Sequence, residues 1–292
     1  MKKFNVLTID GGGIKGLRSL FIIKEIEDRM GMMSHEIFDL IAGTSTGGII
    51  ATMLALGYSA DEVIELYMNH GPKIFEKKCC RFGWFRPKYD DDYLNQVISD
   101  YMMGRKLSDC QTELIVPAYN IETRDKILFK TNRGFDYPLF DVVRATVSAQ
   151  SYFKPHKIDG QRHIDGGNVI NNPSMIAYVE YKKRWSDRPL NMLSIGTGRE
   201  EERIKKSQGG GGLLTWAGPT VDILLVEQSQ QTDYFMSKLE PYDYIRIEPV
   251  STAGSVEMDN ATKENLLMLK ADGEQTIRQN DALIEAFIKK IS

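Results

Sequence analysis

The N-terminal part of the chain alternates apolar runs with helical patterns. Asn5 to Ile9 is apolar and β-branched, as in a strand, and apolar positions from Leu17 to Ile26 then recur at helical spacing until Gly31. A second apolar run, Phe38 to Ala42, precedes another helical run from Gly48 to Leu56. This order of strand, helix, strand and helix predicts an α/β fold in which neighbouring strands are parallel.

The same two patterns continue to the C-terminus. Later strands are predicted over Glu113 to Ala118, Lys126 to Lys130, Asn191 to Ile195 and Tyr244 to Glu248. Helices are predicted over Ala60 to Met68, Asp92 to Tyr101, Val221 to Leu239 and Ala261 to Ile291, with Gly273 as a candidate interruption of the last one.

Composition and charge then exclude several classes of protein. The 292 residues are 42% hydrophobic and 26% charged, as in an ordinary globular protein, and the net charge of −3 provides no basic field for a nucleic-acid polymer. Three cysteines exclude a disulfide scaffold and favour reduced thiols in the cytosol. Four histidines, none of them after position 163, argue against a metal centre.

No membrane-spanning or targeting segment is expected. The N-terminus runs into a glycine turn rather than a signal-peptide cleavage site. The longest uncharged stretch, Leu40 to Ala60, is broken by glycines and fits a strand, a turn and a helix better than one membrane span. We therefore expect a cytoplasmic protein.

The first glycine turn, Asp10-Gly11-Gly12-Gly13-Ile14-Lys15-Gly16, follows the first predicted strand and matches G-x-G-x-x-G. Such a turn binds a dinucleotide pyrophosphate at a helix N-terminus, forms an oxyanion hole from backbone N–H groups, or is only a tight turn. A Walker loop is excluded because Leu17 stands where that loop needs lysine. A dinucleotide site also needs a carboxylate at the end of the second strand, where this chain has Gly43-Thr44-Ser45.

The second turn, Gly43-Thr44-Ser45-Thr46-Gly47, matches G-x-S-x-G between a strand and a helix. The small residues on either side allow a sharp turn that exposes the serine hydroxyl as a nucleophile. Because the carboxyl ends of parallel strands share one edge of a sheet, we expect the two turns to lie together.

A serine nucleophile needs a base, and the residues leave two arrangements open. Asp165-Gly166-Gly167 places a carboxylate in a tight turn, where a raised pKa would allow Asp165 to act as the base itself. No histidine follows Asp165, so the chain order Ser, Asp, His cannot be built with it. An earlier acid with His156 or His163 remains the alternative, and a plain Asx turn is the reading without catalysis.

Four motifs, in order, resemble those of the patatin-like phospholipase family. They are Asp10 to Gly16 as oxyanion loop, with Lys15 in place of the usual arginine; Gly43 to Gly47 as nucleophile elbow; Arg144 to Phe153, with Gln150 in place of a usual proline; and Asp165 to Gly167, followed by Asn171-Asn172-Pro173. The resemblance covers residues 4–198, including Ser194 to Gly198 as a later strand of the family.

The resemblance implies a fold and a mechanism. The fold is a three-layer α/β/α sandwich with a central, mostly parallel sheet, in which residues 4–198 form the catalytic core and residues 199–292 form a helical extension packed on the same domain. The implied mechanism is a Ser45–Asp165 dyad that hydrolyses phospholipid or lysophospholipid through an acyl-enzyme. Gly12 and Gly13, with Gly11, hold the oxyanion, and neither a metal nor an organic cofactor is required.

One further segment, Lys73 to Tyr89, carries six basic residues, one acidic residue and five interleaved aromatic residues. This combination suits a lid or a peripheral contact with an anionic membrane, and less well single-stranded nucleic acid. A partly packed connection whose lysines face water is an equally simple reading.

Other functions remain open from the residues. They are a dinucleotide-binding oxidoreductase that uses the first glycine turn, a lipid-binding module without catalysis, and acyl transfer to an acceptor other than water. The resemblance extends to bacterial members that degrade membranes in antiviral defence and respond to small nucleotides, which adds a nucleotide activator, oligomer formation and action at the inner face of the membrane as expectations.

Overall fold

The protein forms one mixed β-sheet between layers of helices. The structure is a computed structural model, and it describes residues 2–76, 86–131, 134–198, 213–251 and 257–291. The strands are β1 (Phe4–Ile9), β2 (Leu40–Gly43), β3 (Glu113–Asn120), β4 (Asp125–Lys130), β5 (His156–Ile158), β6 (Gln161–Asp165), β7 (Leu190–Ile195) and β8 (Tyr244–Ile247).

The strand order is β5-β6-β3-β2-β1-β7-β8, and β4 pairs with β3 outside this path. Neighbours from β3 through β2, β1 and β7 to β8 are parallel, whereas β4, β5 and β6 are joined by antiparallel pairings. The predicted strands are all present, with ends shifted by no more than two residues.

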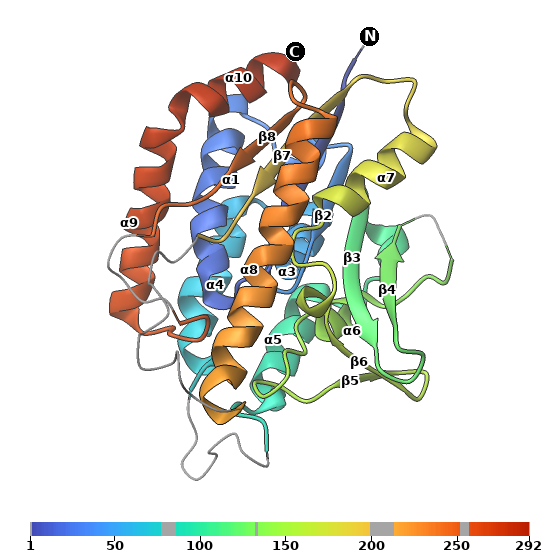
Figure 1. Ribbon diagram of the computed structural model, residues 1–292, viewed down its shortest axis with the longest axis vertical. Coiled ribbons are helices and arrows are strands. Elements are labelled where there is room, and N and C mark those ends of the chain that lie inside the picture. The colour runs from blue at the N-terminus through green and yellow to red at the C-terminus, as the bar shows by residue number, and fades with distance from the viewer. Residues whose placement is uncertain (1, 77–85, 132–133, 199–212, 252–256, 292) are drawn as a thin grey trace.

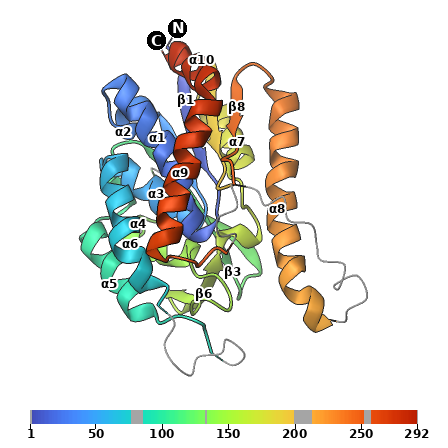
Figure 2. The same ribbon diagram turned by 90° about the vertical axis from the view of Figure 1, so that its left-hand side faces the viewer.

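Helices cover both faces of the sheet (Figures 1 and 2). They are α1 (Gly16–Met30), α2 (Ser34–Ile37), α3 (Thr46–Ala55), α4 (Ala60–Ile74), α5 (Asp91–Met102), α6 (Leu139–Thr146), α7 (Ser174–Arg184), α8 (Leu213–Leu239), α9 (Lys263–Gln279) and α10 (Asp281–Ile291). Every residue of β1 is buried, because alternate side chains enter two different cores. Leu7 and Ile9 pack in the core that contains α1, α3 and α9, and Val6 packs with Ala177 of α7 and Met236 of α8. The predicted three-layer α/β/α sandwich is confirmed.

The elements absent from the sequence prediction are short or depend on tertiary partners. The hairpin of β5 and β6 has strands of three and five residues, and β6 is held by pairing with β3. Helices α2, α6 and α7 were also missed; α7 has a weakly patterned sequence that ends in the basic run Lys182, Lys183 and Arg184. Local pattern alone does not distinguish such segments from loops.

The interruption expected at Gly273 is wrong. Helix α9 continues through Gly273 and ends before Asn280, where α10 begins one residue later. A Cβ atom at Gly273 would lie 2.9 Å from Cβ of Phe21 and 3.3 Å from the carbonyl oxygen of Arg18, both on α1. The glycine therefore permits a close approach of α9 to α1, beside a fully buried ion pair of 2.6 Å between Arg18 and Asp272.

The C-terminal region supplies more than helices. Strand β8 pairs in parallel with β7, α9 packs along α1 on one face of the sheet, and α8 packs with α7 on the other. The C-terminal region therefore completes the same sheet and helps to cover both of its faces. The division into residues 4–198 and 199–292 stays a prediction.

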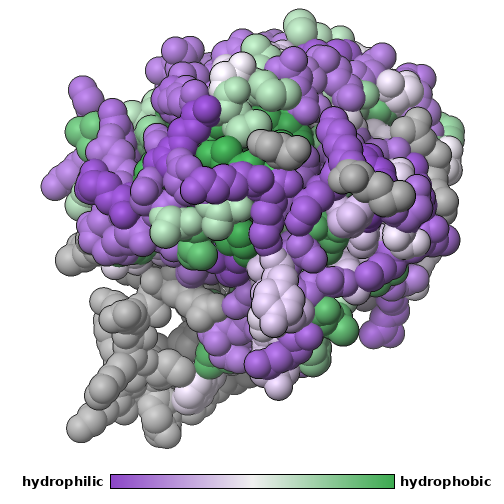
Figure 3. All heavy atoms as spheres, turned by 90° about the horizontal axis from the view of Figure 1, so that it is seen from above, coloured by the Kyte–Doolittle hydropathy of each residue, from purple (hydrophilic) through white to green (hydrophobic). Residues whose placement is uncertain are grey.

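None of the helices in the described residues has the length and apolar character needed to cross a bilayer. The end of the molecule that carries both termini is predominantly hydrophilic (Figure 3).

We predict that Gly273→Ala destabilises the protein, although alanine is the better helix former. Helix propensity alone would stabilise it by about 1 kcal/mol, but the clash with α1 should cost about 1–3 kcal/mol. Urea unfolding measures the net free-energy change. Ala271→Gly, at an exposed position of the same helix, gives the propensity contribution without the contact. A stabilised Gly273→Ala variant would contradict the packing role.

Candidate active site

The two turns picked out in the sequence leave the sheet side by side. Strands β1 and β2 are parallel neighbours, with Ile9 aligned to Gly43, so both turns lie at one carboxyl edge as predicted. A Cβ atom at Gly47 would lie 2.3 Å from the carbonyl oxygen of Ile9, and one at Gly16 would lie 2.6 Å from Oγ1 of Thr46. Their small size is therefore what lets the two turns touch.

Ser45 occupies a strained position at the start of α3. Its φ of 53° and ψ of −120° place a non-glycine residue in a conformation that costs on the order of 1–3 kcal/mol. The Ser45 N–H donates to Oγ1 of Thr146 at 3.0 Å, and the Thr146 hydroxyl donates to the Pro117 carbonyl of β3 at 2.7 Å. On the other side, the Thr44 hydroxyl donates to the Ile170 carbonyl at 2.7 Å. These bonds hold the turn and leave the Ser45 hydroxyl free for another partner.

That partner is Asp165. The antiparallel pairing of β6 with β3 aligns Asp165 with Ala118, near the end of β3 that extends beyond β2. The Ser45 hydroxyl donates to Oδ2 of Asp165 at 2.6 Å, and the Gly167 N–H donates to Oδ1 at 2.7 Å. Gly166 fits only because it has no side chain, since a Cβ atom there would lie 2.2 Å from the Pro117 carbonyl oxygen. The Asp165 carboxylate therefore makes both interactions. Its Oδ1 accepts the Gly167 N–H, as in an Asx turn, and its Oδ2 accepts the Ser45 hydroxyl.

Burial changes the acidity of this carboxyl group. Asp165 is 6% exposed. Burial raises its pKa from 3.8 to about 6, and the hydrogen bonds from Ser45 and Gly167 offset part of that rise. The group is still ionised near neutral pH, but it is a stronger base than an exposed aspartate.

None of the four histidines takes this place. His163 is buried beside Asn120, and His156 pairs with Asp141 at 2.7 Å. His70 lies 2.7 Å from the Tyr93 hydroxyl, and His35 has no hydrogen bond to the site. Burial lowers the pKa of His163. In the part of the chain that the structure describes, no histidine contacts Ser45 or Asp165. The geometry therefore pairs these two residues and does not form a triad.

Two residues of the first glycine turn, Gly12 and Gly13, line the same cavity as Ser45. Gly11 donates its N–H to the Asn171 carbonyl at 3.2 Å, and Ile14 donates to the Met258 carbonyl at 2.9 Å. For Gly12 and Gly13, the described residues provide no acceptor, and both line the cavity together with Ser45. Gly13 needs glycine because its φ is +60° and an added Cβ would lie 2.2 Å from the Met258 carbonyl oxygen. Lys15, the departure in this motif, is buried at the N-cap of α1.

An apolar cavity of about 200 Å³ opens over Ser45 and Asp165. Its walls come from several helices and from the loop after α6, and they include Ile49, Leu66, Ile74, Phe75, Phe153 and Leu225. Phe75 packs edge-on against the buried Tyr89, so these two aromatic residues of Lys73 to Tyr89 face the interior rather than a membrane. Residues 77–85 of that segment lie outside the described residues.

Comparison with known proteins identifies the family. A family model described as patatin-like phospholipase matches residues 7–178, which is more than half of the chain. The chain belongs to the patatin-like phospholipase family. It is 29% identical to Patatin-like protein 2 of Arabidopsis thaliana, over 94% of this chain and 83% of that protein.

The patatins of Solanum tuberosum show a similar likeness. The chain is 27% identical to "Probable inactive patatin-3-Kuras 1", over 94% of this chain and 86% of that protein. Among solved structures, human GIVD cytosolic phospholipase A2 with a fluorophosphonate inhibitor and terbium chloride has a TM-score of 0.52 at 11% identity. The structural alignment covers 99% of this chain and 59% of the phospholipase chain, and the likeness supports the fold alone.

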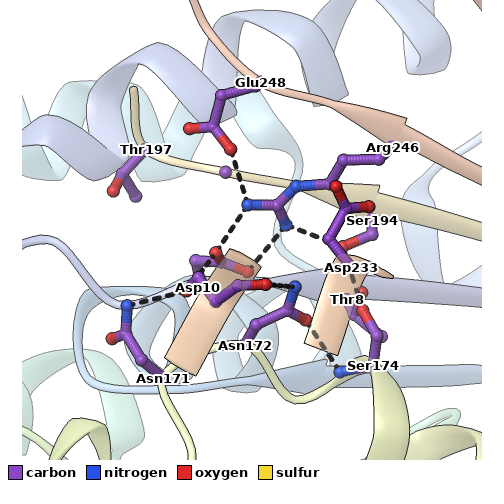
Figure 4. A network of polar contacts seen from close by, with 12 residues as sticks. Thr8, Asp10, Asn171, Asn172, Ser174, Ser194, Thr197, Asp233, Arg246 and Glu248 are labelled. Carbon is purple, nitrogen blue, oxygen red and sulfur yellow. Dashed lines mark hydrogen bonds and ion pairs between the residues drawn. The ribbon is translucent and has the colours of Figure 1, made fainter. Parts of the chain in front are cut away.

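A buried ionic network below the glycine turn was not predicted from the sequence of this patatin-like chain (Figure 4). Arg246 on β8 donates to both oxygens of Asp10, at 2.9 and 2.7 Å, and also to Glu248 at 2.7 Å and to Ser194 on β7 at 2.8 Å. Ser229 on α8 donates to Asp10 at 3.0 Å. The first residue of the glycine turn, Asp10, is thus held by side chains from β8 and α8, neither of which carried a recognisable motif in the sequence.

The replacement of the usual proline by Gln150 has a structural partner. Gln150 and Asn168 exchange two side-chain hydrogen bonds of 3.1 Å, and Asn168 also donates to the Asp165 carbonyl at 2.7 Å. Asn171 donates its side-chain N–H to Ser229 at 3.1 Å and accepts the Gly11 N–H with its carbonyl. Asn168 and Asn171 therefore connect the Asp165 turn to Gln150, to the first glycine turn and to α8. The sequence had marked Asn171 as part of a motif but had given it no role.

We predict that Arg246→Met is strongly destabilising. It leaves the buried carboxylate of Asp10 without the arginine that neutralises it, and breaking such a pair costs about 3–5 kcal/mol. Urea unfolding measures the loss, and the double variant Arg246→Met with Asp10→Asn should recover part of it. Arg162→Met is the control, because the pair of Arg162 with Glu122 is exposed and should contribute little. Equal effects of the two single variants would contradict the role of the network.

Proposed function

We propose that this patatin-like protein is a lipid acyl hydrolase of the phospholipase A or lysophospholipase type, with Ser45 as nucleophile and Asp165 as general base. The observation that carries the proposal is the hydrogen bond of 2.6 Å from the Ser45 hydroxyl to Asp165 at the base of an apolar cavity. Ester hydrolysis through a covalent acyl-enzyme needs a nucleophile that is hydrogen-bonded to a base, and Ser45 and Asp165 are arranged in this way.

In the acylation step, Ser45 Oγ attacks the ester carbonyl carbon while Asp165 accepts the hydroxyl proton. The negative charge that develops on the carbonyl oxygen lies near the N–H groups of Gly12 and Gly13 and the N-terminal end of α3, all of which stabilise an anion. When the C–O bond to the lipid alcohol breaks, Asp165 returns the proton to the departing oxygen. The acyl group is then bonded to Ser45.

In the deacylation step, Asp165 takes a proton from a water molecule, whose oxygen attacks the acyl carbon. The resulting oxyanion is stabilised by the same N–H groups, and the fatty acid leaves as the proton returns to Ser45. Gly11, expected as a third donor, already donates its N–H to Asn171. The proposed oxyanion hole is therefore reduced to Gly12 and Gly13.

The cavity favours an acyl chain over a dinucleotide. Its side chains are mainly aliphatic and aromatic, and each methylene that leaves water contributes about 0.8 kcal/mol. The substrate class that follows is a phospholipid or lysophospholipid. A nucleotide activator, oligomer formation, a role in antiviral defence and action at the inner face of a membrane stay predictions of the family resemblance.

We expect Ser45→Ala and Asp165→Ala each to lower phospholipid hydrolysis by about 10³-fold or more, because each removes one member of the dyad. Mass spectrometry of released fatty acid and lysophospholipid measures the rate. A fluorophosphonate probe should label wild type on Ser45. Ser237→Ala, an exposed serine on α8, is the control and should keep full activity. Hydrolysis that survives Ser45→Ala would overturn the proposal.

The pH profile tests the base separately. Asp165 must be ionised to accept the serine proton, and its pKa is raised to about 6. We therefore expect kcat/KM for a soluble ester to fall about tenfold per pH unit below about 6 and to level off above it. An imidazole base would give a similar midpoint, so the profile is repeated for His156→Asn and His163→Asn. Loss of the acid limb in either histidine variant would contradict Asp165 as base.

A further inference from the structure

Three aliphatic side chains on one turn of α8 lie exposed beside the cavity. Ile223 is 38% exposed, Leu224 is 57% exposed and Val226 is 40% exposed. Leu225, in the middle of the same turn, points the other way and lines the cavity over Ser45. We call Ile223, Leu224 and Val226 the aliphatic patch. One helical turn thus supplies part of the cavity wall and an apolar outer surface.

The position of this turn relative to the site is set by several contacts. Gln228 donates to the Asn168 carbonyl at 3.3 Å, and Ser229 donates to Asp10 at 3.0 Å. Leu225 is close enough to the aspartate turn that a Cβ atom added at Gly167 would lie 3.4 Å from its Cδ2. Figure 2 shows α8 on the opposite side of the sheet from α1 and α4. The turn of α8 that carries the aliphatic patch is therefore held next to the Asp165 turn and the first glycine turn.

We propose that the aliphatic patch is the surface by which the protein docks on a lipid bilayer. The proposal rests on the lipid substrate of the proposed function, because such a substrate must pass from the bilayer into the cavity. Side chains that insert between lipids beside the cavity shorten that path and exclude water from it. Contiguous exposed aliphatic side chains on a helix are also a feature of interfacial membrane contacts.

The surrounding residues favour a bilayer over other occupants. The stretch from Leu213 to Gln231 contains no lysine or arginine, so its attraction to lipid is apolar rather than ionic. The exposed polar residues Glu227 and Gln231 separate the patch from the exposed Tyr234 and Phe235 further along α8. The exposed aliphatic side chains nearest the cavity are therefore those of the patch. Three side chains are few for a stable protein interface, which uses about 20–30 residues on each side.

The binding test uses Ser45→Ala as parent, so that vesicles stay intact. Sedimentation with phosphatidylcholine vesicles should show about tenfold weaker binding for Leu224→Asp, because a charge replaces an inserted aliphatic side chain. Leu239→Asp is the matched control. Leu239 is 53% exposed, on the same helix and about 22 Å further along, and its variant should bind as the parent does. Binding should also persist at high salt, unlike binding through the basic segment Lys73 to Tyr89.

Activity provides the second readout. In the otherwise wild-type enzyme, with Ser45 intact, Leu224→Asp should hydrolyse a soluble short-chain ester at the wild-type rate. Its rate on phospholipid vesicles should fall about tenfold. Absence of any serine-dependent hydrolysis would refute the proposed function and leave the vesicle result standing. Unchanged vesicle binding by Leu224→Asp, or an equal loss with Leu239→Asp, would overturn the docking surface. A change in oligomeric state on size-exclusion chromatography without a change in vesicle binding would assign the patch to a second copy of the chain instead.

Discussion

The site depends on the close contact between the two turns that follow β1 and β2. The parallel register of the strands brings the turns to one edge, and Gly16 and Gly47 leave no space for a side chain where they meet. Because the backbones can approach so closely, Gly12 and Gly13 line the same cavity as Ser45. Both strand pairing and residue size are needed, since either alone would leave the turns apart.

Asp165 joins this arrangement from the antiparallel part of the sheet. The β5–β6 hairpin returns along β3 and places the carboxylate against Ser45 in a buried position. Burial makes the group more basic, and the same burial lowers stability above its pKa, because the unfolded chain ionises aspartate more readily. The sign follows from a folded pKa of about 6 against 3.8, so stability falls as pH rises through that interval. The strained Ser45 backbone is a second local cost of the same site.

The C-terminal half supports the motifs that the N-terminal half supplies. Arg246 of β8 pairs with Asp10, and Ser229 of α8 bonds the same carboxylate. Helix α9 packs against α1, which begins at the end of the glycine turn. These contacts join α8, β8 and α9 to the N-terminal motifs, so the glycine turn is held by residues that follow it by more than two hundred positions.

The sequence by itself determined the strand and helix order around both turns and the resemblance to the family, and it named Ser45, Asp165 and the glycine turn as candidates for the site. It could do so because strand period, glycine spacing and motif order are properties of short segments. Only the tertiary structure decided that Gly11 is already bonded, that no histidine reaches Ser45, and that Gly273 serves contact rather than interruption. The role of Arg246 and the exposure of the aliphatic patch were also visible only in the tertiary structure. Burial, pairing and exposure are relations between segments distant in the chain, and no local pattern records which segments meet.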